Sequence, residues 1–222
     1  MFRKQNGRTS DNNGQVVAIN MGTGSVQNPT VQEMEDSDVT AEKNRIEGLV
    51  NTHSVNSEAL VVRNLTKTFG KVIPIQAVNG LSFGVHPEEC FGLLGVNGAG
   101  KTTTFRMLTG DETVSDGNAW IGELALRQHL QAFQQRVGYC PQFDALLNKM
   151  TGRETLFLFC RLRGMCEDMI DTYVKDLTAM VDLIPHVDKC TDTYSGGNRR
   201  KLSLAIALCA APPVIFLGTV PY

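Results

Sequence analysis

One short segment limits what this chain can fold into more than any other feature. The residues GVNGAGKT at positions 95–102 fit the pattern GxxxxGK[ST], and they follow an apolar run that is typical of a strand. Glycines in this pattern let backbone N–H groups turn inward around phosphate oxygens, and the helix after the loop adds the positive end of its dipole. The segment predicts a phosphate-binding loop between a strand and a helix. Lys101 is expected at the β- and γ-phosphates, and the Thr102 hydroxyl on Mg²⁺.

Ordered structure is expected to begin near Ala59, where the first strand-like apolar run occurs. A strand near residue 83 is placed at a sheet edge, and the apolar run after Cys90 is predicted to be a parallel strand covered on both faces. A capping box at Thr151 and Glu154 opens one helix, and Ser195 can cap another. Strands are predicted at 60–62, 65–69, 81–85, 90–94, 119–121, 137–140 and 214–217, the last again buried, and helices at 100–108, 151–162, 169–181 and 195–208.

The first 57 residues differ from the rest of the chain. They are rich in Asn, Ser, Thr, Gly and Glu, contain few aromatic residues and show no sustained periodicity. Such a segment has too little apolar surface to offset the entropy lost on ordering. We therefore predict a disordered polar linker at 1–57 and one globular domain at 58–222.

Composition excludes several classes of function. The formal net charge is −2, so there is no basic footprint for nucleic acid. The six cysteines include no CxxC pair and the four histidines are isolated, which favours reduced thiols of a cytosolic domain and no metal centre built from Cys and His. No secretory signal is readable, and the apolar run at 202–217, interrupted by Pro212 and Pro213, is too short to span a bilayer. Any membrane part is expected to lie elsewhere.

A phosphate loop alone fits a kinase, a GTPase or a transport ATPase, so the choice depends on motifs further along the chain. The residues Ser195, Gly196 and Gly197 open a helix shortly before the apolar run at 213–217, and Gln142 lies between them and Lys101. In this order and spacing the chain resembles an ATP-binding cassette. The Ser-Gly-Gly turn matches the family's signature motif, from whose commonest form Tyr194 and Asn198 depart.

The resemblance implies an α/β fold of the P-loop NTPase type, with a mixed core sheet flanked by helices and a helical signature subdomain. It implies that Gln142 approaches Mg²⁺ and the attacking water and couples to a transmembrane part. It places adenine on Phe69, for which a core aromatic at a strand end is the alternative. By resemblance, ATP contacts Phe69, Gly95, Asn97, Gly98, Ala99, Gly100, Lys101, Thr102, Thr103, Ser195, Gly196 and Gly197, and Mg²⁺ contacts Thr102 and Gln142.

Longer stretches resemble the A subfamily of these transporters, namely residues 102–111, 139–146, 162–164 and 195–203. That resemblance implies a lipid exporter or translocator whose transmembrane domains are not encoded here. It also implies a second cassette, because two cassettes in the family enclose ATP head to tail. The chain is then expected at the cytosolic face of a membrane, or in the cytoplasm if it exists alone.

The family pattern breaks after Leu217. An Asp that holds Mg²⁺ and a Glu that polarises the attacking water are expected there, and this chain has Gly218 and Thr219. Without a positioned general base the rate is expected to fall about 100- to 10,000-fold. We read the domain as incomplete at its C-terminus, through a splice event, a frameshift or a gene-model error, and expect low stability or dependence on a partner.

Two functions are consistent with this sequence. The first is the ATP-powered motor of a lipid-type transporter, of which this chain is an incomplete copy. The alternative is a non-hydrolysing ATP-binding or regulatory fragment that pairs with a complete cassette. A soluble cassette unrelated to transport is a third reading, against which Gln142 and the A-type stretches argue.

Overall fold

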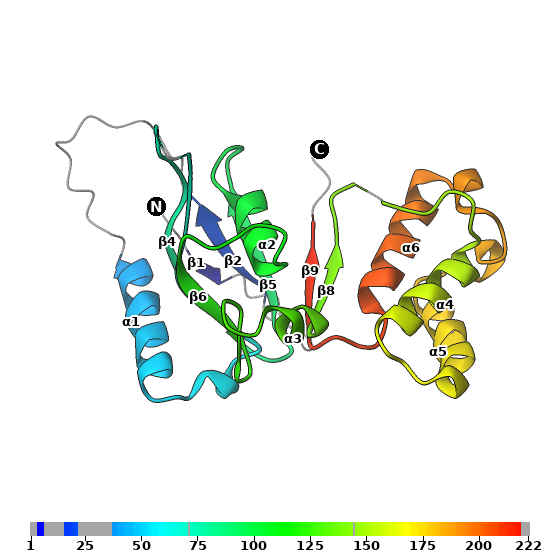
Figure 1. The fold of residues 1–222 in the computed structure, drawn as a ribbon, viewed down its shortest axis with the longest axis horizontal. Helices are drawn as coiled ribbons and strands as arrows, with labels where there is room; N and C mark the ends of the chain where they lie inside the picture. Colours follow the sequence, from blue (N-terminus) through cyan, green and yellow to red (C-terminus); the bar gives the residue numbers. More distant parts are fainter. Residues whose placement is uncertain (1–3, 7–15, 22–36, 71, 144, 219–222) are drawn as a thin grey trace. The chain divides into compact units, whose positions relative to one another are not determined.

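The structure, a computed structural model, describes residues 4–6, 16–21, 37–70, 72–143 and 145–218 (Figure 1). The chain divides into two units, Met1–Gln134 and Gln135–Tyr222, and each is described by itself. Within the described ranges, every helix is too short or too polar to cross a membrane.

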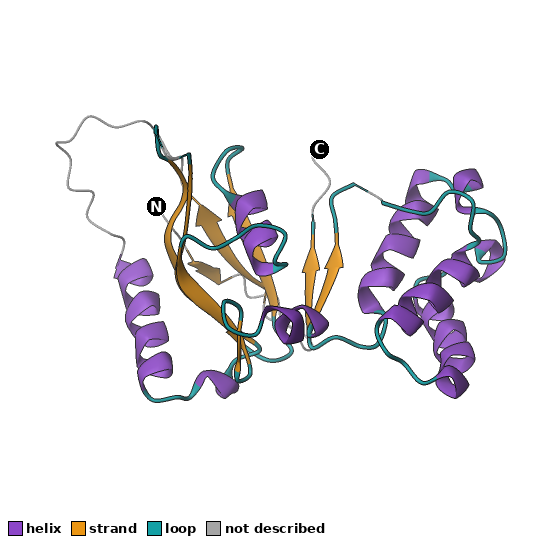
Figure 2. Ribbon diagram, viewed as in Figure 1, coloured by secondary structure: helices purple, strands orange, loops and turns teal. Residues whose placement is uncertain are grey.

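An antiparallel sheet forms most of the first unit (Figure 2). It contains β3 (Leu60–Phe69), β4 (Ile75–Val85), β6 (Asp116–Ile121) and β7 (Leu124–Ala125), in the order β4-β3-β6-β7. Several apolar side chains of β3 and β4 are buried, among them Val61, Val62, Leu65, Leu81 and Phe83. The strands predicted at 60–69 and 81–85 are confirmed, and β4 lies at the sheet edge as expected.

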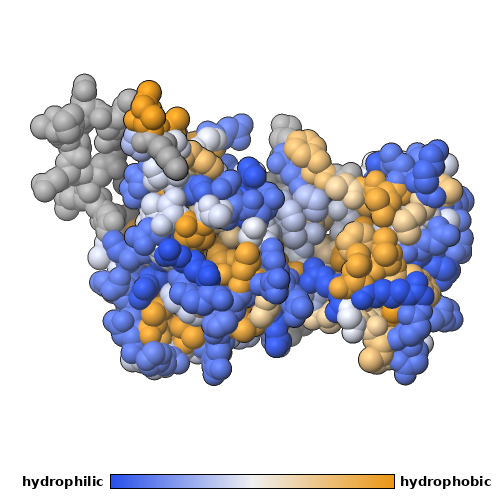
Figure 3. All heavy atoms as spheres, in the orientation of Figure 1, coloured by the Kyte–Doolittle hydropathy of each residue, from blue (hydrophilic) through white to orange (hydrophobic). Residues whose placement is uncertain are grey.

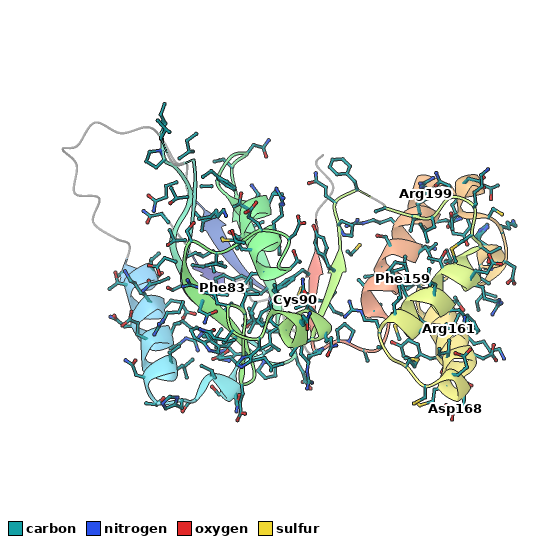
Figure 4. All side chains as sticks on the ribbon, viewed as in Figure 1. Phe83, Cys90, Phe159, Arg161, Asp168 and Arg199 are labelled. Atoms are coloured by element: carbon teal, nitrogen blue, oxygen red, sulfur yellow. The ribbon has the colours of Figure 1, made fainter. Side chains whose placement is uncertain are left out.

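The strand before the phosphate loop is β5 (Cys90–Gly95), which belongs to a second sheet with the order β1-β2-β5. Here β1 covers Lys4–Asn6 and β2 covers Val16–Met21, and β2 runs parallel to β5. The prediction of a parallel strand is confirmed, but burial on both faces is wrong, since Leu94 is 55% exposed. An apolar run carries no information about which elements will cover a strand. One face does have an aromatic contact, because the rings of Phe91 and Phe83 stack with their centroids 4.8 Å apart. Phe83 is labelled in Figure 4.

Helix α1 (Ser37–Asn51) occupies part of the range predicted to be a disordered linker. Ile46 is fully buried, and α1 lies against β4, where a backbone N–H of Gly84 donates to Glu42 at 2.9 Å. Arg45 pairs with Glu42 at 2.8 Å and with the buried Glu58 at 2.5 Å. The linker prediction is therefore wrong for this helix and for the short 3₁₀ helix η1 (Val55–Ser57) after it. It is also wrong for β1 and β2, which lie in the same predicted range. Helix α1 is held largely by charged contacts. Because the prediction of order relied on apolar residues, which are few in this segment, the helix was not predicted.

Two further helices complete the first unit. Helix α2 (Lys101–Leu108) begins directly after the phosphate loop, as predicted, and buries Thr104, Met107 and Leu108. Helix α3 (Leu130–Gln135) buries Phe133. The buried face of α2 fixes the far end of the loop on the folded unit.

The second unit combines a two-stranded sheet with a cluster of helices. Strands β8 (Val137–Cys140) and β9 (Val214–Leu217) run parallel. Both strands were predicted, but the burial expected for β9 is wrong except at Phe216, because Leu217 is 51% exposed. Again the apolar run identified the strand without identifying what covers it. The helices are α4 (Gly152–Leu162), α5 (Glu167–Met180), η2 (Ile184–His186), η3 (Thr191–Thr193) and α6 (Gly196–Leu208).

Helices α4, α5 and α6 share one apolar core (Figure 2). Leu156, Ile170, Val174 and Leu202 are fully buried in it. The capping box at the start of α4 is confirmed, since Thr151 accepts from the backbone of Glu154 while the Glu154 carboxylate accepts from the backbone of Thr151. This cluster is the helical subdomain that the resemblance implied.

Candidate nucleotide-binding site

The phosphate loop lies between β5 and α2 and owes its shape to two glycines. Gly98 and Gly100 have φ angles of 87° and 88°, a region that favours glycine. A Cβ on Gly100 would lie 2.3 Å from the carbonyl oxygen of Ala77 on β4, whereas one on Gly98 would meet nothing within 4 Å. Gly100 is therefore required by its backbone angle and by the close approach of β4, and Gly98 by its angle alone.

Lys101 folds back over the beginning of the loop. Its ammonium donates to the carbonyl oxygens of Gly95 at 2.5 Å and of Val96 at 2.8 Å. Both partners are neutral, so the positive charge at the loop is not cancelled by a carboxylate. This is the arrangement that an incoming phosphate needs from its lysine.

The start of α2 suits an anion. No acidic residue lies in its first turn, where negative charge on the protein would repel phosphate. The hydroxyl of Thr102 is exposed, Thr103 is half-buried, and Asn97 projects from the exposed part of the loop. The Ala99 N–H donates to the Val96 carbonyl at 3.2 Å and tightens the turn. The loop residues predicted from the sequence thus lie together, from the end of β5 through the turn to the first turn of α2.

Phe69 ends β3 and is linked to the phosphate loop through β4. It pairs in register with Ile75, and two residues further along β4 the carbonyl of Ala77 lies against Gly100. Adjacent residues of one face of a strand are about 7 Å apart, so the aromatic ring and the loop belong to one region of the first unit. The ring is 38% exposed. This exposure argues against the alternative of a core aromatic at a strand end, while adenine stacking stays a prediction.

The β3–β4 hairpin beyond Phe69 carries exposed hydrophobic residues (Figure 3). Val72, Ile73 and Ile75 are 93%, 77% and 66% exposed. Phe69 thus lies at the strand end of this hairpin, next to its exposed apolar residues. A flat aromatic ligand on Phe69 would have an apolar surface on that side.

Gln142 belongs to the second unit, where it lies just after β8 and is half-buried. Its neighbour across the sheet is Gly218, the first residue after β9, whose N–H donates to the Cys140 carbonyl at 2.8 Å. A Cβ on Gly218 would lie 2.7 Å from the backbone nitrogen of Gln142. The position where an acidic residue was expected therefore lies against the glutamine loop. Thr219 lies outside the described residues.

Arg200 is a residue of this region that the sequence did not reveal. It projects from α6, and its guanidinium donates to the carbonyl oxygens of Pro141 and Gly218. It thereby ties the end of β8 to the end of β9 beside Gln142. Arg199, Arg200 and Lys201 form a basic run in the sequence, which does not indicate the arginine that contacts the strand ends. Arg199, labelled in Figure 4, contacts Asn148 instead.

The Ser-Gly-Gly turn lies at the exposed start of α6. Ser195 is the N-cap, and its hydroxyl accepts from the N–H of Asn198 at 3.3 Å, which confirms the predicted cap. Gly196 and Gly197 are exposed, and a Cβ on either would meet nothing within 4 Å. Packing within the described residues gives no reason for glycine at these two places.

A metal ion finds few ligands among the described residues. No group of three or more His, Cys, Asp and Glu side chains in those ranges is arranged to hold one. Thr102 and Gln142 each offer one neutral oxygen, and they belong to different units. Magnesium fits this donor set only as an ion held chiefly by phosphate oxygens, as is common for nucleotide sites.

Comparison with known proteins assigns this arrangement to a family. The model of the family described as ABC transporter matches residues 78–218. The chain is 48% identical over 193 residues to the phospholipid-transporting ATPase ABCA3 of Rattus norvegicus, and 46% identical over 184 residues to the retinal-specific phospholipid-transporting ATPase ABCA4 of Homo sapiens. These matches cover 86% and 82% of this chain, but only 11% and 8% of the relatives, so the chain spans about a tenth of their length.

Solved structures support the fold. One is a dimeric post-hydrolysis state of the ATP-binding cassette MJ0796 bound to ADP and Pi, with a TM-score of 0.64 at 20% identity over 71% of this chain and 72% of that one. Another is an ATP-binding subunit of an ABC transporter, with a TM-score of 0.64 at 23% identity over 72% of this chain and 65% of that one. At these identities the likeness concerns the fold, and it confirms the predicted cassette architecture.

Proposed function

Because the chain belongs to the ABC transporter family, as a nucleotide-binding domain of its A subfamily, we propose that the loop at 95–103 binds the triphosphate of ATP. The observation that carries this proposal is the loop itself. Two glycines with positive φ precede a helix that has no acidic residue in its first turn, and Lys101 lies over the loop with neutral partners. Phe69 supplies a half-exposed ring for adenine at the end of β3.

Each residue has a separate task in this proposal. Lys101 leaves the two carbonyls of its own loop and contacts the β- and γ-phosphates, while backbone N–H groups of the loop donate to the remaining oxygens. Mg²⁺ neutralises the phosphates when it is bound, with the Thr102 hydroxyl and Gln142 as its protein contacts. The open space over Gly98 leaves room for the phosphates.

The wider role is proposed from the relatives. Their names describe phospholipid-transporting ATPases, so we assign this chain to the ATP-binding part of a lipid transporter at the cytosolic face of a membrane, or to the cytoplasm if the chain exists alone. Its partners are then transmembrane domains and a second cassette. In such a pair, Ser195, Gly196 and Gly197 face the ATP of the other cassette, which explains glycines that packing among the described residues does not require.

A second function is favoured by Gly218. This residue has no carboxylate to hold Mg²⁺, and Thr219 cannot accept a proton from water at neutral pH. Loss of a positioned base costs about 100- to 10,000-fold in rate. We therefore propose that the chain as written binds ATP without efficient turnover, and that it acts as a non-hydrolysing or regulatory partner of a complete cassette.

Substitution of the loop lysine tests ATP binding. Lys101→Ala should weaken ATP binding at least tenfold, because a charge-assisted contact to the phosphates of about 1.5–3 kcal/mol is lost. Lys175→Ala is the matched control, since that lysine pairs with Asp171 on the surface of α5. Equal ATP affinity of the two variants, measured by calorimetry, would refute the site. Phosphate release from the unsubstituted chain at a rate that Lys101→Ala abolishes would refute the non-hydrolysing role.

A further inference from the structure

Lys67 on β3 is a buried cation that the phosphate loop does not use. Its side chain is only 7% exposed. The ammonium lies 2.7 Å from a carboxylate oxygen of Glu112, 2.7 Å from the carbonyl oxygen of Thr113 and 3.1 Å from the Thr113 hydroxyl. The ion pair also lowers the pKa of Glu112 through its hydrogen bond from Lys67. Lys67 therefore anchors β3 to the segment after α2.

This arrangement excludes a direct role for Lys67 at the phosphates. A lysine ammonium has three N–H donors, and each of them has an acceptor among the three oxygens of Glu112 and Thr113. A lysine that binds phosphate must keep donors accessible, as Lys101 does by contacting carbonyls that a phosphate can replace. The charge of Lys67 acts on another neighbour.

That neighbour is the ring of Phe69. The Lys67 nitrogen lies 4.9 Å from the centre of the ring, within the range of a cation–π interaction. Residues 67 and 69 are two apart on one strand, so their side chains project from the same face of the sheet. The cation thus covers one face of the ring. The exposed part of Phe69 remains accessible to a ligand.

A cation behind an aromatic ring changes what can stack in front of it. The faces of aromatic rings carry negative charge density, so two rings stacked face to face repel each other electrostatically. A positive charge on the rear face offsets this repulsion, and it also holds the ring in one orientation. Adenine, whose face is rich in electrons, gains from both effects.

We propose that Lys67 is a positioning residue of the base subsite, holding the Phe69 ring from behind so that a purine base stacks on the opposite face. This inference rests on the proposed function, because it requires that ATP binds at the adjacent loop. It separates the recognition of the base, by Phe69 backed by Lys67, from the recognition of the phosphates by residues 95–103.

The test compares ATP with inorganic tripolyphosphate, which has the phosphates and no base. Both affinities are measured by calorimetry on the full 222-residue chain. Lys67→Met keeps an unbranched side chain only one atom shorter and removes the charge, so the affinity for ATP should fall about three- to tenfold while that for tripolyphosphate stays within about twofold. Lys67→Arg keeps a cation over the ring and should restore most of the ATP affinity. Lys175→Met, in the surface pair with Asp171, is the control for loss of a lysine.

Glu112→Gln is a second variant, and it is expected not to weaken ATP binding. It removes the counter-charge of Lys67 but keeps an amide oxygen as acceptor, so ATP should bind as well as before or more tightly. A merely structural role of the ion pair would weaken ATP and tripolyphosphate together in both variants, and that outcome overturns the inference. Unchanged ATP affinity in Lys67→Met also overturns it. If the unsubstituted chain binds neither ligand, the proposed function fails and this inference fails with it.

Discussion

At the residue level, Gly98 and Gly100 show that two glycines of one motif are required for different reasons. Both have positive φ, which costs about 1–2 kcal/mol for a residue with a side chain. Only Gly100 also has a backbone oxygen, that of Ala77, 2.3 Å from where a Cβ would lie. A flexible side chain can move aside, but the carbonyl of a paired strand cannot.

We expect Gly100→Ala to destabilise the chain more than Gly98→Ala. The Gly98 variant should lose about 1–2 kcal/mol from its backbone angle alone, while the Gly100 variant should lose at least about 1 kcal/mol more as β4 and the loop separate. Urea unfolding of both variants measures the difference. Equal losses would mean that the loop does not pack closely on β4.

At the element level, the start of α4 depends on a carboxylate. Glu154 accepts from the Thr151 backbone N–H at 2.8 Å and from its hydroxyl at 3.0 Å, and these bonds lower the pKa of Glu154 below its ordinary value of 4.5. A lowered folded-state pKa means that the ionised cap stabilises the helix above pH 4.5. That stability is lost as the pH falls through the folded-state pKa.

Glu154→Gln should therefore change how stability depends on pH. The amide keeps an acceptor for Thr151 but has no charge to lose. The unsubstituted chain should be more stable than the variant at neutral pH, and the difference should shrink as the pH falls below 4.5. Urea unfolding across that range measures it. A difference that is the same at every pH would show that the charge has no part in the cap.

Helix α6 carries the arginine that ties β8 to β9. Arg200→Met should lose about 1–3 kcal/mol of stability, since the carbonyls of Pro141 and Gly218 both lose a charged donor. Arg199→Met is the matched control, because Arg199 makes one long bond of 3.4 Å to Asn148 and should change stability by less than about 0.5 kcal/mol. Urea unfolding compares the two. Similar losses would contradict the role given to Arg200.

Local signals in the sequence predicted most of the helices and strands. They could not predict which elements far apart in the sequence contact each other. The capping box of α4, the N-cap of α6 and the loop before α2 are written in residues a few positions apart, and all three were confirmed. The partner of β5 is β2, which lies about 70 residues earlier; its short apolar run at 16–19 stands in a polar segment that was predicted to be a linker. Helix α1 was not predicted because it is held by an ion pair from Arg45 to Glu58 and by a single buried residue among those described, Ile46.

The same limit applies to the candidate site. GxxxxGK[ST] is a local pattern, and the residues taken from it run without a break from the end of β5 through the turn into the first residues of α2. The contacts of Lys67 with Glu112 and of Arg200 with Gly218 join residues 45 and 18 positions apart. No pattern in the sequence indicates such pairs, so the supporting residues of the site became visible only on the folded units.

At the level of the whole molecule, the proposed function requires two chains for one ATP. In a head-to-tail pair, each nucleotide would contact the loop at 95–103 of one cassette and the Ser195 turn of the other. A chain without an efficient base would hold ATP in this sandwich rather than consume it. ATP should therefore promote association of the chain with itself or with a complete cassette.

If this arrangement is correct, two variants that are each defective in ATP-dependent association should complement each other in a mixture. Lys101→Ala removes phosphate binding, and Gly197→Glu places a carboxylate where the partner's ATP would lie. The second variant should fold normally, because a Cβ at Gly197 meets nothing within 4 Å and an acidic residue suits the first turn of a helix. Neither variant alone should associate with ATP. A mixture should form heterodimers with one intact site, composed of the loop of the Gly197→Glu chain and the Ser195 turn of the Lys101→Ala chain. Analytical ultracentrifugation with ATP measures this, and no association of the mixture, under conditions where the unsubstituted chain dimerises, would exclude the head-to-tail arrangement.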